Sequence, residues 1–181
     1  KKLFNNNYNN LKEHMQQSLA PNIKKEAFQQ IIRYYQNNED IFNNIYETEI
    51  SVTIEKQDYY IGGKIDLVIE KNNRYLLIDF KAQKPNVSEE QLKQYKLQLA
   101  TYANLLKEKA GIVVDEVLIY WTGAVNNDEA KLKLNISDIE LSKADKYFDN
   151  IVRKIKKSEY SQDKDISNKI CQECDFRFYC S

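Results

Sequence analysis

Two acidic residues interrupt strand-like runs that are otherwise apolar: Asp66 in GGKIDLVIE and Asp79 in LLIDFK. A buried carboxylate without a partner is costly, so each needs a cation or hydrogen-bond donors. Lys81 follows Asp79 by two positions and, in a strand, projects from the same face. Two carboxylates and an ammonium at one point can hold Mg²⁺ and position an attacking water. A structural ion pair between Asp66 and Lys81 is the alternative that these residues leave open.

Three consecutive strands must position these side chains. Residues 45–55 alternate between apolar and polar, as a half-buried strand does. Residues 59–70 and 74–81 follow, with a Lys-Asn-Asn turn between them. Two hairpins in sequence predict an antiparallel three-stranded meander. Asp66 and Asp79 then lie side by side on adjacent strands.

The remaining elements predict an α/β fold. Apolar spacing favours helices at about 8–20 and from residue 21 onward, a helix at 88–109, strands at 113–121 and 130–136, and a helix at 137–157. Ser88 is a plausible N-cap, with two acids in the following turn. The order ααβββαββα indicates one mixed central sheet flanked by helices. We expect a core over 1–157 and, as part of the same domain, a connector with a cysteine knuckle over 158–181.

Length and composition bound the class of protein. The chain has 181 residues, with 27 basic and 27 acidic side chains and a formal net charge of zero. This fits one folded domain, and the neutral balance gives no general sign of nucleic-acid binding. No apolar run is long enough to span a membrane and no signal peptide opens the chain, so we expect a cytoplasmic protein. Because it begins with Lys1, we expect it to be a fragment.

The three cysteines, Cys171, Cys174 and Cys180, all lie near the end of the sequence. A secreted disulfide framework would spread an even number along the chain. The C-x2-C-x5-C spacing instead favours three thiolates around one metal or iron–sulfur centre. Three reduced surface thiols and a zinc knuckle are the alternatives. A four-thiolate site needs one more cysteine, which this sequence does not contain.

The ordered motifs resemble those of the PD-(D/E)XK nuclease superfamily, specifically its RecB-like branch. Its G-x-x-D motif is matched by Gly63–Asp66 and its (D/E)-x-K motif by Asp79–Lys81. The terminal cysteines are similar to three ligands of its iron–sulfur nucleases, which include AddB-type, helicase-fused and CRISPR-adaptation enzymes. The resemblance implies a restriction-endonuclease-like core. It also implies a [4Fe–4S] cluster in the full-length protein, with the fourth cysteine upstream of this chain.

The resemblance also implies roles at the site. His14, Asp66, Asp79 and the backbone carbonyl of Phe80 would bind Mg²⁺ or Mn²⁺, and Lys81 would orient or help deprotonate water. Asp66, Asp79 and Lys81 would be the catalytic residues. By itself, a lone histidine on a helix is more typical of an ordinary exposed side chain.

A Q-x-x-x-Y motif typical of the same branch occurs twice on the helix expected at 88–109. Gln98 and Tyr102 are preferred for DNA positioning, because Ala-Asn-Leu-Leu follows them. Gln91 and Tyr95 fit the same pattern seven residues earlier and lie on nearly the same helix face. The alternative is an amphipathic helix whose tyrosines pack against the sheet.

We therefore expect a metal-dependent deoxyribonuclease that hydrolyses phosphodiester bonds. The resemblance implies exonuclease-like processing of single strands or DNA ends in repair and recombination, as part or partner of a helicase. The rival is a non-catalytic DNA-binding or assembly module that keeps the fold. With no net charge, the domain should bind DNA weakly and with strong dependence on metal and salt.

Overall fold

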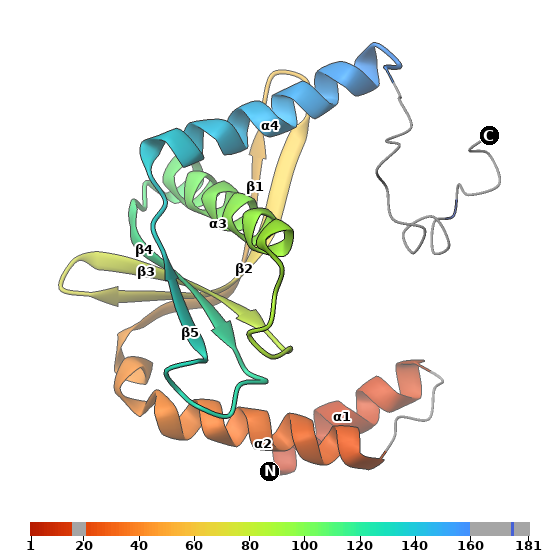
Figure 1. Ribbon diagram of the computed structural model, residues 1–181, viewed down its shortest axis with the longest axis vertical. Helices are drawn as coiled ribbons and strands as arrows, with labels where there is room; N and C mark the ends of the chain where they lie inside the picture. Colours follow the sequence, from red (N-terminus) through yellow and green to blue (C-terminus); the bar gives the residue numbers. More distant parts are fainter. Residues whose placement is uncertain (16–20, 160–174, 176–181) are drawn as a thin grey trace. The chain divides into compact units, whose positions relative to one another are not determined.

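The structure is a computed structural model that describes residues 1–15, 21–159 and 175. The chain divides into two compact units, Lys1–Ala144 and Asp145–Ser181. The first unit holds the whole sheet, and within it α3 and α2 lie on opposite sides of the sheet (Figure 1). No helix in the described part of the chain is both long and apolar enough to cross a membrane.

The sheet has five strands in the order β1-β2-β3-β4-β5. Their bounds are Ile45–Glu55, Tyr60–Lys71, Arg74–Lys81, Val114–Trp121 and Lys131–Leu134. Strands β3 and β4 pair in parallel, and the other neighbours are antiparallel. The parallel pair requires a crossover, which α3 (Glu89–Ala110) supplies. The predicted meander and mixed sheet are confirmed.

The hairpin between β2 and β3 fixes the register of the two acids. Asn72 and Asn73 have φ of 55° and 59°, and positive φ at both central residues is the requirement of a type I′ turn. Asparagine tolerates this conformation better than most residues. Leu67 lies opposite Ile78. Continuing this register by one residue on each strand sets Asp66 beside Asp79.

The helices are α1 (Lys2–Met15), α2 (Pro21–Asn37), the 3₁₀ helix η1 (Glu39–Asn44), α3 and α4 (Asp138–Lys156). Helix α1 begins at Lys2, well before residue 8, the start expected from its apolar spacing. Three asparagines at 5–7 separate Leu3 and Phe4 from the later apolar positions, and asparagine is a weak helix former, so the spacing does not predict this first part. The predicted end of α1 lies outside the described residues. Ser88 and Gln91 form a full capping box at the start of α3, which confirms the predicted N-cap.

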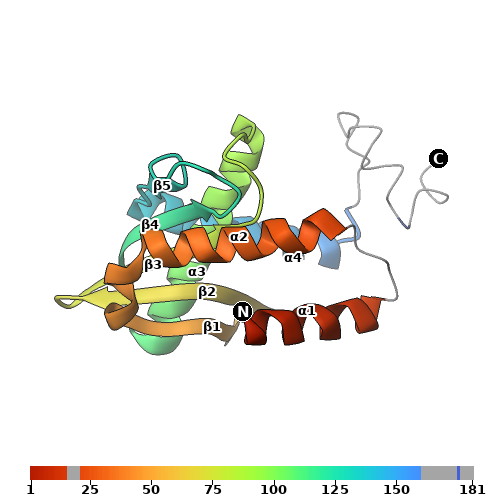
Figure 2. The same ribbon diagram turned by 90° about the horizontal axis from the view of Figure 1, so that it is seen from below.

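The two faces of β3 contact different helices. Phe80 packs its ring against Tyr34 of α2, with 5.0 Å between the ring centroids. Lys81 donates a hydrogen bond to Gln98 of α3. Successive residues of a strand point to opposite faces, so α2 covers one face and α3 the other (Figure 2). The core on the α3 side includes the fully buried side chains of Leu77, Leu99, Leu105 and Ile119.

Candidate functional site

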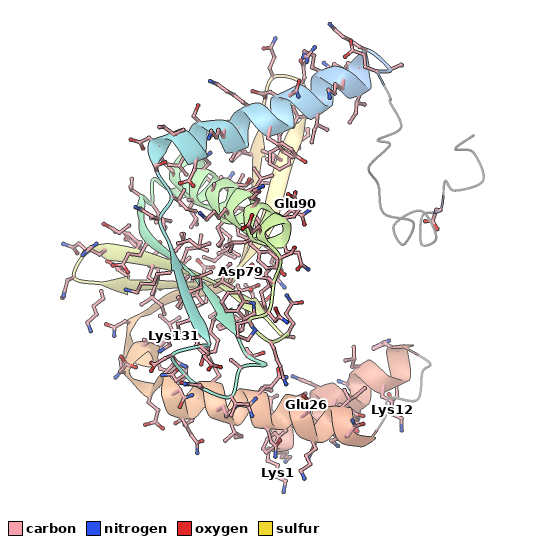
Figure 3. The ribbon with its side chains drawn as sticks, in the orientation of Figure 1. Lys1, Lys12, Glu26, Asp79, Glu90 and Lys131 are labelled. Atoms are coloured by element: carbon pink, nitrogen blue, oxygen red, sulfur yellow. The ribbon has the colours of Figure 1, made fainter. Side chains whose placement is uncertain are left out.

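The middle of β2 and the end of β3 bring the two acids together. The backbone N–H of Phe80 donates to Oδ2 of Asp66 at 2.8 Å, which ties the aspartate to the next strand. Asp66 is partly buried, whereas Asp79 is only 4% exposed. In Figure 3, Asp79 lies beneath α3. The structure thus places two carboxylates at one point on adjacent strands, as the motif spacing predicts.

Burial raises the pKa of the Asp79 carboxyl, and the nearby charge of Asp66 raises it further. The Lys81 ammonium opposes this and lowers the same pKa. Nζ of Lys81 lies 2.7 Å from Oδ2 of Asp79. The angles at this contact are not those of a good hydrogen bond, and Oδ2 has no acceptable donor among the described residues. It is a buried oxygen that lacks a well-aligned partner.

Three groups surround the Lys81 ammonium. Besides Asp79, Oε1 of Gln98 accepts a hydrogen bond from Nζ at 3.1 Å. The ring of Tyr95 lies beneath the same nitrogen, 4.5 Å from it to the ring centroid. An anion, a carbonyl oxygen and an aromatic face each attract a positive charge. The side chain is only 18% exposed, so these contacts hold the ammonium in a largely buried position.

Gln98 is itself held by Tyr102. Its Nε2 donates to the Tyr102 hydroxyl at 2.9 Å, which orients the amide so that its oxygen faces Lys81. The Tyr102 ring lies against Gly63 on β2, where a Cβ would stand only 2.5 Å from Cε1 of the ring. Glycine at this position is therefore required by the close approach of the ring. A chain of contacts runs from Gly63 through Tyr102 and Gln98 to Lys81.

The structure separates the two Q-x-x-x-Y matches. Gln98 and Tyr102 are hydrogen-bonded to each other, whereas Gln91 belongs to the capping box of Ser88. Tyr95 nevertheless reaches the site, and its hydroxyl accepts a hydrogen bond from Gln83. The motif predicts Gln98 and Tyr102 at the site and does not predict this contact of Tyr95. Its spacing of three residues from Gln98, on the same helix face, is the signal that would have found it.

Helix α2 supports the site from the other face of the sheet. Tyr34 packs edge-on against both Phe80 and Tyr120, and burial raises its pKa to about 12, with Tyr120 adding to the shift. The hydroxyl of Thr122 donates to Gln30, and its backbone N–H donates to the carbonyl of Lys81. These contacts fix the end of β3, where Asp79 and Lys81 lie.

One residue expected to bind the metal, His14, is not brought to this point. His14 is exposed on α1, and the described residues contain no group of three or more His, Cys, Asp or Glu side chains suited to one metal ion. Cys171, Cys174 and Cys180 lie outside the described residues. The acidic side chains that the structure gathers at the site are Asp66 and Asp79.

These two carboxylates fit a hard divalent cation. Mg²⁺ takes oxygen ligands and is commonly held by one or two carboxylates together with waters and phosphate oxygens. The buried Oδ2 of Asp79 lacks a well-aligned donor, and Asp66 stands beside it. A cation between them would compensate both charges, which the single ammonium of Lys81 does only in part.

Comparison with known proteins gives a consistent result. The model of the PD-(D/E)XK nuclease superfamily matches residues 4–181. The structure is similar to that of a candidate exonuclease from Eubacterium rectale, with a TM-score of 0.60 and 16% identity, covering 99% of this chain and 70% of that one. It is also similar to SSO0001, with a TM-score of 0.51 and 21% identity, covering 89% and 71%. A search of curated proteins found no significant match.

Proposed function

Because the chain belongs to the PD-(D/E)XK nuclease superfamily, we propose that it is a divalent-metal-dependent nuclease that hydrolyses phosphodiester bonds in DNA. One observation carries the assignment of its site. The buried Oδ2 of Asp79, beside Asp66, lacks a well-aligned hydrogen-bond donor in the described chain, and the fixed ammonium of Lys81 stands next to it. Two acids and a lysine gathered on adjacent strands are the groups that metal-assisted hydrolysis needs.

Asp66 and Asp79 would hold the cation, with the backbone carbonyl of Phe80 as a further proposed ligand. When bound, the cation supplies Lewis-acid polarisation of the phosphate and a more acidic water. Lys81 would stabilise charge on the phosphate oxygens and orient the attacking water. Its contacts with Gln98 and Tyr95 keep the ammonium at one position, so little reorganisation is needed during the reaction.

Finer features of the proposal rest on sequence motifs. The hydrogen-bonded Gln98 and Tyr102 support a RecB-like enzyme in which they also position DNA. The Eubacterium rectale protein of similar fold is a candidate exonuclease, which is consistent with exonuclease-like action. We infer the preference for single strands or ends from the motif resemblance. We further propose a role in repair or recombination beside a helicase domain or subunit, His14 as an additional metal ligand, and an iron–sulfur cluster on Cys171, Cys174 and Cys180.

The test is cleavage of end-labelled single-stranded DNA with Mn²⁺ by the wild type, Asp79→Asn and Lys81→Met. We expect both variants to lose at least a hundredfold in rate. Asp115→Asn is the matched control, because Asp115 is an acid of β4 that pairs with Arg74 near the start of β3. It should cut at the wild-type rate. Undiminished cutting by Asp79→Asn and Lys81→Met would contradict the assignment of the site.

The ion pair between Lys81 and Asp79 favours one rival, a fold that keeps these residues only for structure. Metal binding separates the two readings without any cleavage assay. In the proposed nuclease, Mn²⁺ raises the melting temperature of the wild type, because the ion binds only the folded state. Asp66→Asn/Asp79→Asn should lose this increase. An equal increase in both proteins, or none in either, supports the rival.

A further inference from the structure

The zero net charge of the chain conceals an uneven distribution. Residues 1–37 contain six Lys or Arg and two Glu, a formal charge of +4, so the rest of the chain carries −4. This basic segment comprises helices α1 and α2, and Lys1 and Lys12 lie toward opposite ends of α1 (Figure 3). The carboxylates of the candidate site belong to the acidic remainder. The positive charge is therefore concentrated on an element separate from the metal-binding acids.

Aromatic rings lie between these cations. Phe4 of α1 contacts Phe28 of α2 with 5.1 Å between ring centroids, and it stacks beside Tyr8 at 6.3 Å. Nζ of Lys24 lies 4.6 Å from the centroid of the Tyr8 ring. All three rings remain partly exposed. They join the two helices and still offer apolar surface to a ligand.

A cavity of about 240 Å³ opens at this junction, lined by Lys1, Phe4, Asn5, Lys24, Lys25 and Phe28. Its wall is aromatic and its remaining lining is cationic or amide. It is smaller than the pockets that hold drug-sized ligands, which suits one flat ring better than a larger molecule. We call the surface formed by these six residues together with Tyr8 the helix-pair surface.

The side chains of the helix-pair surface form a row along the axis of α1. Lys1, Asn5, Tyr8 and Lys12 follow one another at intervals of three or four residues and thus share one face of α1. From Lys1 to Lys12 this face extends about 16 Å, at about 1.5 Å per residue. A row of cations with an aromatic ring and an amide between them matches a strand with charged phosphates and flat bases.

We propose that the helix-pair surface binds single-stranded DNA, with a base against the rings of Phe4 and Phe28 and phosphates at the lysines. This inference rests on the proposed nuclease function and deepens it, because it specifies how an unpaired strand is held outside the metal site. Duplex DNA presents no unstacked base to an aromatic ring. The surface therefore selects single strands over duplexes.

The experiment measures binding of fluorescein-labelled dT20 to the full chain by anisotropy, in EDTA so that no cleavage occurs. Lys24→Gln/Lys25→Gln should weaken binding about tenfold at low salt and reduce the slope of log K against log salt by about 1.4, or about 0.7 for each lost phosphate contact. Phe28→Leu keeps an apolar side chain but removes the ring. It should weaken binding about fivefold or more and leave the slope unchanged.

The control is Lys107→Gln/Lys109→Gln, which removes the same charge from two exposed lysines near the end of α3. It should bind dT20 within twofold of the wild type. Equal weakening by both lysine pairs would overturn the proposal, as would an unchanged salt slope in the helix-pair variant. Competition by poly-glutamate or duplex DNA as effective as that by unlabelled dT20 would also overturn it, because the surface would then recognise charge alone.

The two proposals fail separately. If the helix-pair variants lose binding but the wild type never cuts DNA, the nuclease proposal is wrong and the binding surface stands. If the wild type cuts and the helix-pair variants bind dT20 normally, the binding surface is wrong and the nuclease stands.

Discussion

Substitution of Gly63 by alanine tests the chain of contacts that ends at Lys81. A Cβ at Gly63 would stand 2.5 Å from Cε1 and 3.1 Å from Cδ1 of the Tyr102 ring, distances that the ring cannot accept without moving. The backbone at Gly63 is not in the left-handed region, so alanine is allowed there apart from this contact. The substitution therefore isolates one steric clash. Its effect should pass through Tyr102 to the orientation of Gln98.

The expected magnitude follows from two opposing effects. Forcing extra volume into a packed site costs about 1–3 kcal/mol. Replacing glycine by alanine in a tolerated conformation stabilises by about 0.4–1 kcal/mol, because the unfolded chain loses freedom. The net result is destabilisation by about 1–2 kcal/mol, or about 3–6 °C in melting temperature for a chain of this size. DNA cleavage should fall as well, because the displaced ring no longer holds Gln98.

A double-mutant cycle with Tyr102→Ala tests whether the clash with the Tyr102 ring causes the destabilisation by Gly63→Ala. In the Tyr102→Ala background the ring is absent, and the nearest remaining atom, Cδ1 of Leu105, stands at an ordinary 3.5 Å. Gly63→Ala should then be neutral or slightly stabilising. Urea unfolding of the four proteins measures the coupling. Equal destabilisation by Gly63→Ala in both backgrounds would show that the clash with Tyr102 is not the reason for the glycine.

Three further predictions concern the same region. Asp79→Asn should be more stable than the wild type at pH 7–8, by about 1 kcal/mol. The raised pKa of Asp79 means that its ionised form destabilises the fold. In thermal melts, the stability difference between Asp79→Asn and the wild type should therefore shrink as the pH falls to about 4. A difference that stays constant with pH would show that ionisation of Asp79 is not its cause. Tyr95→Leu should slow cleavage about two- to fivefold through loss of the ring beneath Lys81, while Tyr95→Phe should cut normally; equal rates for both variants would exclude the ring contact. Ser88→Ala should lower stability by about 1 kcal/mol in urea titrations, since it removes the N-cap of α3, and an unchanged midpoint would show that the cap contributes nothing.

The central strands and the two acids could be predicted because their signals are local. The alternation in β1 and the Asn72-Asn73 turn each specify a hairpin over a few residues. Once the register is set, Asp66 and Asp79 can only be neighbours. Lys81 lies two residues after Asp79 in β3, so its side chain can be predicted to project from the same face of the strand.

The contacts made by α3 and α1 could not be predicted in the same way. Gln91 and Gln98 lie on nearly the same face of one helix, so spacing alone does not say which of them reaches Lys81. The capping box at Ser88 engages Gln91 and leaves that contact to Gln98. Tyr95 contacts Lys81 because of the position of α3 over the sheet, which only the tertiary packing determines. The position of His14 depends on the packing of α1 in the same way.

The residues from Gly63 to Tyr102 form one continuous stretch that contains every contact described for the Lys81 side chain. Each of these contacts closes a loop of moderate length, so the entropy lost in forming them is modest and does not depend on distant parts of the chain. We expect residues 63–71 of β2, all of β3 and residues 89–102 of α3 to behave as one cooperative unit in hydrogen exchange. Such a unit can form early in folding, before β5 pairs with β4. Asp66, Asp79 and Lys81 would then share one free energy of local unfolding. A destabilising substitution in this stretch would lower hydrogen-exchange protection at all three residues together.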